Sequence, residues 1–307
     1  MRVCSDINNF GKVKNPVVTT GTFDGVHVGH QKLIRRLKEL ARKTEGETVL
    51  ITFYPHPRMV LFPDDNELRL LNTQEEKKEL LERFGIDHLV VIPFTKKFSR
   101  LTSLEFVRDI LANKIGTKKL VIGYDHHFGR NREGSFAHLK EFGPVYGFDV
   151  KEIPAIDVDN IHVSSTKIRE ALAKGDISTA NLYLGYEYSL RGKVVKGEQL
   201  GKALGFPTAN IEVGDKYKLV PADGIYAVTA EHEGVTYKGM MSIGFNPTVD
   251  GKKRTLEVNL FDFDKDIYGS VLKVNFREWL RKEKKFSSLD ALKKQLHADK
   301  QATLKVF

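Results

Sequence analysis

The chain has 307 residues, of which 41% are hydrophobic and 29% charged, with a formal net charge of +9 and one cysteine, Cys4. This length favours two domains that each bury a core, and the composition is that of a soluble globular protein. One cysteine excludes an internal disulfide and a cysteine-rich zinc site. With no apolar run as long as a membrane span and no signal-peptide core at its start, the sequence predicts a cytoplasmic, reducing location.

The first predicted unit is a strand, a glycine-rich turn and a helix. An apolar run over residues 17–20 enters the turn at 21–30, and apolar residues recur at helical spacing over 33–40. Backbone N–H groups and the positive end of the helix then meet at one point, which suits a phosphate. His27 and His30 add ring donors beside that point. The turn matches neither the GxxxxGK[ST] nor the GxGxxG phosphate loop.

Strands and helices alternate through the rest of the first half. The sequence predicts strands at 48–53, 88–92, 120–122 and 149–153, and helices at 73–84, 103–115, 135–142 and 165–174. Thr73 and Glu76 form a capping box at the start of the second helix. The alternation predicts an α/β, Rossmann-like parallel sheet, in which ligands sit at the carboxyl ends of the strands.

The motif His27-Val28-Gly29-His30 resembles the HxGH signature of the nucleotidylyltransferase superfamily. The whole string Gly21–His30 resembles the FMN adenylyltransferase module of bacterial bifunctional riboflavin kinase/FAD synthetases. Alone, the string is also compatible with a glycine turn that carries two surface histidines. The segment Tyr54–Pro57 has two prolines and a stiff backbone, and together with Phe53 it would wall a flavin ring. The alternative is an ordinary turn with aromatic packing.

Two more segments match the same family in order. Gly123–Gly134 resembles its next motif, where Asp125 contacts the nucleotide. This sequence carries His126 and His127 where an aromatic and a variable residue often stand, so their roles are open. A metal cluster with Asp125 is the alternative, although adjacent histidines on an extended chain point in different directions. Ser164–Arg169 resembles the second nucleotide motif; its hydroxyls could bind phosphate or simply cap a helix, and its arginine could grip a phosphate bidentately.

Near residue 184 the alternation stops and short β-like runs begin. They lie at residues 188–196, 225–232, 235–243, 256–260 and 271–279. Regular short strands predict a closed antiparallel barrel. A final helix is expected, capped by Ser287 with Asp290 three residues on, and with Leu289, Leu292 and Leu296 as its apolar face.

Gly201–Asn210 is the key stretch of this half. Its glycines leave open backbone for phosphates, and Thr208 and Asn210 offer hard oxygen ligands for Mg²⁺. The stretch resembles the PTAN motif of riboflavin kinases; a glycine-rich hairpin loop is the alternative. Glu257 faces the opposite way from its strand neighbours and could be a solvated outer-face residue. The resemblance instead implies that it is the catalytic base. Residues 244–248, 257–263 and 281–286 match the same family, so the resemblance covers nearly the full chain.

The resemblance implies a nucleotidylyltransferase domain at residues 1–184 that makes FAD from FMN, and a riboflavin kinase domain at 185–307 that makes FMN from riboflavin. It implies ATP and Mg²⁺ as cofactors and FMN and FAD as substrate and product. The implied sites are: catalytic, His27, His30, Arg169 and Glu257; adenylyltransferase nucleotide, Gly21, Thr22, Phe23, Asp24, Gly29, Asp125, Ser164, Ser165 and Thr166; adenylyltransferase flavin, Phe53, Tyr54, His56 and Pro57; kinase nucleotide, Gly201, Lys202, Gly205 and Pro207; kinase flavin, Arg281 and Glu283; metal, Thr208 and Asn210. Because His30 stands at a helix start, its cationic form should be disfavoured.

The expected partners are riboflavin, FMN and ATP, without nucleic acid or membrane, for a monomer or weak homo-oligomer. Three alternatives stay open: a transferase with another acceptor, such as nicotinamide mononucleotide or phosphopantetheine; a flavin-binding protein with one half inactive; and a nucleic-acid-binding protein. The basic charge admits the last of these. However, lysines alternate with glutamates, the longest basic run is Lys252–Arg254, and no basic stripe with interleaved aromatic residues is visible.

Overall fold

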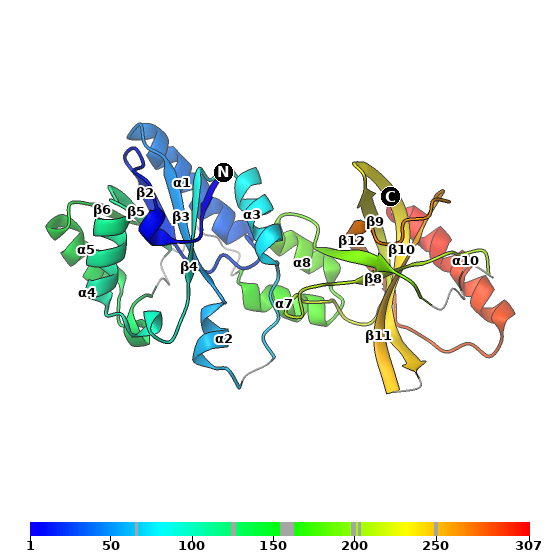
Figure 1. The fold of residues 1–307 in the computed structure, drawn as a ribbon. Helices are drawn as coiled ribbons and strands as arrows, with labels where there is room; N and C mark the ends of the chain where they lie inside the picture. The colour runs from blue at the N-terminus through cyan, green and yellow to red at the C-terminus, as the bar shows by residue number, and fades with distance from the viewer. Residues whose placement is uncertain (65–66, 124–126, 154–162, 198–200, 202–203, 249–250) are drawn as a thin grey trace. The chain divides into compact units, whose positions relative to one another are not determined.

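The computed structural model describes the chain apart from residues 65–66, 124–126, 154–162, 198–200, 202–203 and 249–250 (Figure 1). The chain forms two compact units, Met1–Ser164 and Ser165–Phe307. Among the described residues, no helix combines the length and the apolar character that crossing a membrane requires.

The first unit is built on a six-stranded sheet of order β1-β4-β3-β2-β5-β6, in which every neighbouring pair is parallel. Its strands are β1 (Arg2–Cys4), β2 (Val17–Thr20), β3 (Thr48–Tyr54), β4 (His88–Pro93), β5 (Lys119–Gly123) and β6 (Asp149–Ile153). The chain runs outward from β2 to one side and then crosses to β5 on the other. This is a topological switch point, where open α/β sheets bind ligands. The parallel sheet and its strand order confirm the predicted Rossmann-like fold.

Helices and turns connect these strands. They are η1 (Ile7–Asn9), α1 (Val28–Lys43), α2 (Pro57–Leu61), α3 (Gln74–Arg83), η2 (Phe98–Arg100), α4 (Ser103–Glu105), η3 (Phe106–Lys114), η4 (Arg130–Arg132) and α5 (Phe136–Val145). The capping box predicted at Thr73 and Glu76 is confirmed. The helix predicted over 103–115 forms, but its larger part, η3, has π-helical hydrogen bonding.

Two apolar clusters pack against the sheet of this unit. Val17 belongs to a cluster with Ile34 and Leu37 of α1, whereas Val18 belongs to a cluster with Leu111 of η3. Successive strand residues point to opposite faces, so β2 contributes to both clusters. All four residues of β2 are buried. The strand that leads into the glycine-rich turn is therefore held firmly on both sides.

The second unit contains α7 (Ser165–Ala173), α8 (Ile177–Leu184), a closed barrel and α10 (Leu289–Val306). The barrel order is β10-β11-β8-β7-β12-β9. Its strands are β7 (Ser189–Val195), β8 (Ala209–Glu212), β9 (Gly224–His232), β10 (Val235–Thr248), β11 (Gly251–Leu260) and β12 (Val271–Arg281). All neighbouring pairs are antiparallel, which confirms the predicted barrel and its C-terminal helix.

Helices α7 and α8 pack on the barrel. The Asn181 side chain donates to the Phe276 carbonyl (2.9 Å) and accepts from the Tyr188 N–H (2.7 Å). The Ala222 N–H donates to the Leu172 carbonyl (2.9 Å). The compact units thus divide at residues 164 and 165, whereas the functional modules were expected to divide near 184. That functional division stays a prediction.

Two details of the last helix differ from the prediction. Its N-cap is Ser288, not Ser287, because the Ser288 side chain accepts from the N–H of Ala291 (3.2 Å). Either of two adjacent serines can cap a helix, and the register of the helix on the barrel selects one. Leu289 is 69% exposed and does not belong to the apolar face. Leu296 packs on a buried cluster that includes Phe206.

Candidate functional site

The glycine-rich turn between β2 and α1 has an unusual backbone. Phe23 (φ +48°) and Val26 (φ +35°) lie in the left-handed region, as does Gly25 (φ +85°). A non-glycine residue there costs about 1–3 kcal/mol, and such strain gathers at functional sites. Phe23 and Val26 are almost fully buried, so the surrounding packing holds them in place.

The two motif histidines stack at the start of α1. Their ring centroids are 3.7 Å apart with an interplanar angle of 18°. His27 is the N-cap, and its Nδ1 accepts from the His30 backbone N–H at 3.4 Å. Because Nδ1 accepts, the proton of a neutral His27 ring lies on Nε2, which is left as the donor. Sequence reasoning placed both rings at the helix start, and the structure brings them together there.

The surroundings of His30 favour a neutral ring. Burial lowers its pKa well below the usual value, and His27 and Lys77 lower it further. The ring of Phe23 lies 4.7 Å from that of His30. Within the described part of the chain, the buried His30 Nδ1 has no hydrogen-bond partner. This direction agrees with the expectation that the cation is disfavoured, but its first cause is burial and not the helix start.

Two predicted nucleotide contacts of the turn are engaged with the protein itself. Asp24 is 1% exposed and accepts from the N–H groups of Leu71 (3.0 Å) and Asn72 (3.3 Å). The Thr22 carbonyl accepts from the Nζ of Lys77 (2.8 Å). These contacts shape the turn, and a direct contact of Asp24 with nucleotide stays a prediction. The sequence did not indicate Lys77 as a site residue, because the mixed lysines and glutamates of its helix are typical of a solvent-exposed helix.

The predicted flavin wall follows β3. Phe53 packs against two other phenylalanine rings at centroid distances of 5.7 Å, and Tyr54 is 46% exposed. His56 is the N-cap of α2, with Nδ1 accepting from the Arg58 N–H (3.2 Å), and Pro57 takes the first helical position. Both the packing and the capping suffice to explain these residues, so their flavin contacts stay predictions.

The remaining residues predicted for this site lie in the loop after β5 and at the start of α7. Asp125 and His126 lie outside the described residues, and His127 is exposed. Later in that loop, Gly129 (φ +73°) packs so closely on Ser103 that a Cβ would lie 2.8 Å from its nitrogen. Ser165 begins α7 in the second unit, where Arg169 is half-buried. The roles of Ser164, Ser165, Thr166 and Arg169 stay predictions.

In the barrel, the structure brings three predicted site residues together. Thr208 donates from Oγ1 to Glu257 Oε2 at 3.1 Å. Glu257 on β11 lies directly opposite Asn210 on β8. A Cβ at Gly197 would clash with the Asn210 amide, so a residue without a side chain is needed there. The alternative of a solvated outer-face glutamate does not describe Glu257, which is partly buried and bonded to Thr208.

These residues fit a hard cation. They offer hydroxyl, amide carbonyl and carboxylate oxygens, which are the ligands that Mg²⁺ takes in proteins. Over the described ranges, no three His, Cys, Asp or Glu side chains gather into a metal cluster. Mg²⁺ that is held by few protein oxygens completes its coordination with substrate phosphates and water.

The loop before Thr208 folds back on itself. The Phe206 N–H donates to the Gly201 carbonyl (2.9 Å), Gly205 has φ +82°, and Asn259 Nδ2 donates to the Pro207 carbonyl (2.6 Å). The loop is thus fixed to β11, the strand that carries the predicted base. Lys202 lies outside the described residues.

The two predicted kinase flavin contacts have protein partners. Arg281 donates from Nε and Nη2 to Asp299 on α10 at 2.8 and 2.6 Å. The Glu283 carboxyl lies against Gly244, where a Cβ would clash with it, and accepts from Ser242 Oγ (3.4 Å). Burial raises the pKa of Glu283. Sequence reasoning missed Asp299, which is 3% exposed.

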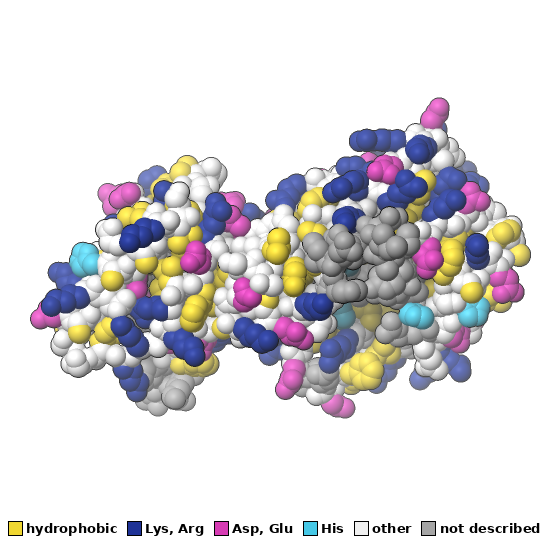
Figure 2. All heavy atoms as spheres, turned by 180° about the vertical axis from the view of Figure 1, so that it is seen from behind, with side chains coloured by type: hydrophobic (Ala, Val, Ile, Leu, Met, Phe, Trp, Pro, Cys, Tyr) yellow, Lys and Arg dark blue, Asp and Glu magenta, His cyan; other side chains and the backbone are white. Residues whose placement is uncertain are grey.

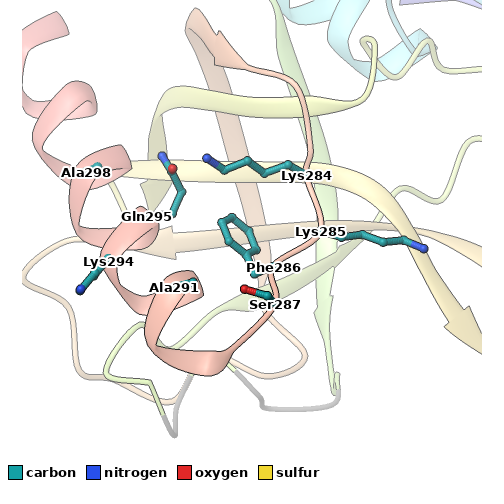
Figure 3. A pocket seen from close by; sticks show the side chains of 8 residues that line it. All are labelled: Lys284, Lys285, Phe286, Ser287, Ala291, Lys294, Gln295 and Ala298. Atoms are coloured by element: carbon teal, nitrogen blue, oxygen red, sulfur yellow. The ribbon is translucent and has the colours of Figure 1, made fainter.

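A pocket of about 440 Å³ opens immediately after these residues (Figure 3). It is lined by Lys284, Lys285, Phe286 and Ser287 of the segment after β12 and by Ala291, Lys294, Gln295 and Ala298 of α10. Lys284, Phe286 and Gln295 lie around the same opening, whereas Lys285 points away from α10. The pocket therefore combines an aromatic ring with positive charge.

Comparison with known proteins supports both halves. A family model described as FAD synthetase matches residues 11–167, and one described as riboflavin kinase matches residues 184–307. A crystal structure described as a macrolide-efflux protein from Streptococcus pneumoniae has a TM-score of 0.89 at 34% sequence identity. The match covers 98% of this chain and 97% of that chain. The efflux description belongs to that protein; the likeness lies in fold and sequence.

Full-length relatives carry one shared name, bifunctional riboflavin kinase/FMN adenylyltransferase. The protein of Escherichia coli (strain K12) is 36% identical and covers 100% of this chain and 98% of its own length. That of Pseudomonas fluorescens is 38% identical over 92% of this chain and 90% of its own. Both halves and their order are shared with these proteins. The chain therefore belongs to the family of bifunctional riboflavin kinase/FMN adenylyltransferases.

Proposed function

We propose that the second unit phosphorylates riboflavin to FMN with ATP and that the first unit joins FMN to AMP from a second ATP, so that one chain makes FAD. Relatives 36–38% identical over at least 90% of both chains carry both activities in their names. The observation that carries the assignment within this chain is the contact of Thr208 with Glu257, opposite Asn210.

In the kinase reaction, Glu257 takes the proton of the ribityl 5′-hydroxyl. The hydroxyl oxygen forms a bond to the γ-phosphorus of ATP, the bond to the β-phosphate oxygen breaks, and ADP leaves. Such transfer depends mainly on positioning and electrostatics. Thr208 and Asn210 would hold Mg²⁺, whose charge neutralises the phosphates when bound. The Thr208 hydroxyl also orients the Glu257 carboxylate through their hydrogen bond.

The pocket beside α10 is the proposed place of the flavin in the kinase. Its volume of about 440 Å³ lies within the usual range for small-molecule sites, about 300–1,000 Å³. The Phe286 ring offers a surface for the isoalloxazine, and Lys284 offers a positive charge for its polar edge. Arg281 and Glu283 stand just before Lys284 in the chain. The family resemblance implies that these two residues contact the flavin.

In the adenylyltransferase reaction, an oxygen of the FMN phosphate attacks the α-phosphorus of ATP and pyrophosphate leaves. No protein nucleophile takes part. We assign His27 and His30 to stabilise the charge that develops on the phosphates, as donors in an oxyanion site do. A neutral His30, favoured by its lowered pKa, donates one hydrogen bond without first taking up a proton.

Two assays test the proposal on the full chain. Riboflavin with MgATP should yield FMN and then FAD, and supplied FMN with MgATP should yield FAD and pyrophosphate, as followed by chromatography. Chelation of Mg²⁺ should stop both, and readdition should restore them. Turnover of nicotinamide mononucleotide or phosphopantetheine in place of flavin would contradict the assignment.

The remaining expectations about partners are also proposals. On the face seen in Figure 2, Lys and Arg side chains are spread over the surface with Asp and Glu among them. This supports small anionic substrates rather than nucleic acid, for which a continuous basic patch is typical. A cytoplasmic location and a monomeric or weakly associating state rest on the sequence alone.

A further inference from the structure

A buried lysine stands behind the adenylyltransferase turn, and neither half-reaction uses it. Lys77 on α3 is 5% exposed, and its Nζ donates to the Thr22 carbonyl at 2.8 Å. Lysine is almost never fully buried unless it is paired. Its position next to the histidine motif therefore needs a reason.

The turn and the start of α3 hold each other at a second point. The Asp24 carboxylate accepts the N–H groups of Leu71 and Asn72, which stand just before α3. The capping box of Thr73 and Glu76 then fixes where the helix begins. Lys77 lies one turn further along. Two side chains therefore join the turn to this segment: Asp24 from the turn and Lys77 from the helix.

The hydrogen bond alone does not explain a lysine at this position. The Thr22 carbonyl also accepts from Thr52 Oγ1 (3.1 Å), so a neutral side chain at position 77 would leave it satisfied. Burial of an ammonium is costly, and burial lowers the pKa of Lys77, while the Asp24 carboxylate opposes that shift. The Asp24 carboxylate therefore favours the charged form of Lys77 where the helix meets the turn.

That charge acts on His30. The groups that lower the pKa of His30 are, after burial itself, His27 and Lys77. His27 lies on the same turn and stacks on the His30 ring, while Lys77 comes from another helix. A charged Lys77 makes a second positive charge on His30 unfavourable, and this adds to the larger effect of burial.

We propose that Lys77 is a positioning residue of the adenylyltransferase site, which fixes the turn through the Thr22 carbonyl and so holds His30 in place at the end of that turn. The inference rests on the adenylyltransferase function proposed for the first unit. It assigns Lys77 an effect through other groups, with no contact to the reacting atoms.

The test compares three variants of the full chain. Lys77→Met removes the charge and keeps the length. Thr52→Val removes the other hydrogen bond to the Thr22 carbonyl and keeps the charge. Lys78→Met removes a charge from the next position on the same helix, where the side chain is half-buried. Each is assayed for FAD formation from FMN, for FMN formation from riboflavin, and for its melting temperature.

A second readout does not depend on activity. Histidine labelled with ¹³C in the ring gives one signal per residue, and the His30 signal is identified by its loss in His30→Gln. In the wild type this signal should titrate at a pH well below that of a free histidine. In Lys77→Met the pKa of His30 should move upward, because one of the groups that lower it is removed, whereas in Thr52→Val and Lys78→Met it should behave as in the wild type.

We expect Lys77→Met to lower FAD formation on the order of 10²-fold, as misplacement of a positioned group does, and to leave the kinase reaction unchanged. Wild-type FAD formation with an unaltered His30 signal would overturn the proposal. If Lys77→Met fails to fold, Lys77→Arg, which keeps the charge, should retain the lowered His30 pKa, and a raised pKa there would also overturn the proposal. Absence of FAD formation in the wild type would instead contradict the function and leave the His30 readout valid.

Discussion

Thr208 and Glu257 are joined by a hydrogen bond of 3.1 Å between residues 49 positions apart in the chain. The bond crosses from the loop before β8 to the middle of β11. It brings Thr208, a proposed metal ligand, into direct contact with Glu257, the proposed base. The kinase site therefore depends on the register of two barrel strands, and changes to either residue should act on the same reaction.

Glu257→Gln keeps the shape of this side chain and removes its basic charge. If Glu257 takes the proton from riboflavin, FMN formation should fall about 10²–10⁴-fold. FAD formation from supplied FMN should persist, because the site proposed for that chemistry contains His27 and His30. Binding of riboflavin should change little, since the amide can still accept from the hydroxyl. Wild-type kinase turnover in the folded variant would remove Glu257 from the mechanism.

His30→Ala deletes a donor from the adenylyltransferase site alone. Loss of one such donor costs about 10²–10³ in rate, so conversion of FMN to FAD should fall by that factor. Phosphorylation of riboflavin in the same preparation is the internal control and should be unchanged. An equal loss of both activities would indicate misfolding or a shared site.

Gly197→Ala should weaken the kinase through its metal ligand. The added Cβ clashes with the Asn210 amide and must displace it. We expect the Mg²⁺ concentration for half-maximal FMN formation to rise several-fold, with FAD formation from FMN as before. Gly214→Ala is the matched control, because a Cβ there meets nothing within 4 Å. An unchanged Mg²⁺ dependence would argue against Asn210 as a ligand.

The ion pair of Arg281 and Asp299 distinguishes a structural from a flavin-binding role. The side chains are 20% and 4% exposed, so breaking the pair leaves a buried charge and costs about 3 kcal/mol. If the pair only anchors α10, Arg281→Met and Asp299→Asn should both lower the melting temperature, by roughly 5–10 °C. Their effects on the KM for riboflavin should then be alike. A raised KM in Arg281→Met alone would support a direct flavin contact.

Glu283 should make stability depend on pH. Burial and, less strongly, Asp223 raise its pKa, against the hydrogen bonds from Ser242 and the Phe245 N–H and the charge of Arg281. A raised folded-state pKa means that its stabilising contribution is present below the usual carboxyl value, about 4.3, and is lost as pH rises through the folded value. Glu283→Gln should therefore melt higher than the wild type at neutral pH, by an amount that shrinks on acidification. Melting curves from pH 4 to 8 measure this.

Much of the fold could be predicted because its main elements are long and periodic. The central strands of the first unit are continuous apolar runs, and most barrel strands are flanked by turn residues. By contrast, β1 and β8 have only three and four residues, too few to show a periodic pattern that separates them from loops. Helix α8 was missed beside the stronger pattern of α7, although it packs on the barrel.

The candidate sites could be predicted where the functional residues stand close together in the sequence. The motif with His27 and His30 and the segment with Thr208 and Asn210 are of this kind. Lys77 was not, because its helix carries alternating lysine and glutamate like any solvated helix, and only the tertiary contact with Thr22 buries it. The partners Arg281 and Asp299 are 18 positions apart, and sequence alone gave no reason to join them.

The tie between Asp24 and the backbone before α3 has a further consequence for dynamics. The amide protons of Leu71 and Asn72 are bonded to that carboxylate, so they exchange with solvent only when the turn separates from α3. Opening of the turn is thereby coupled to opening of a larger cooperative unit. The turn is consequently preorganised, and a nucleotide that bound there, as we propose, would cost little conformational entropy in the turn.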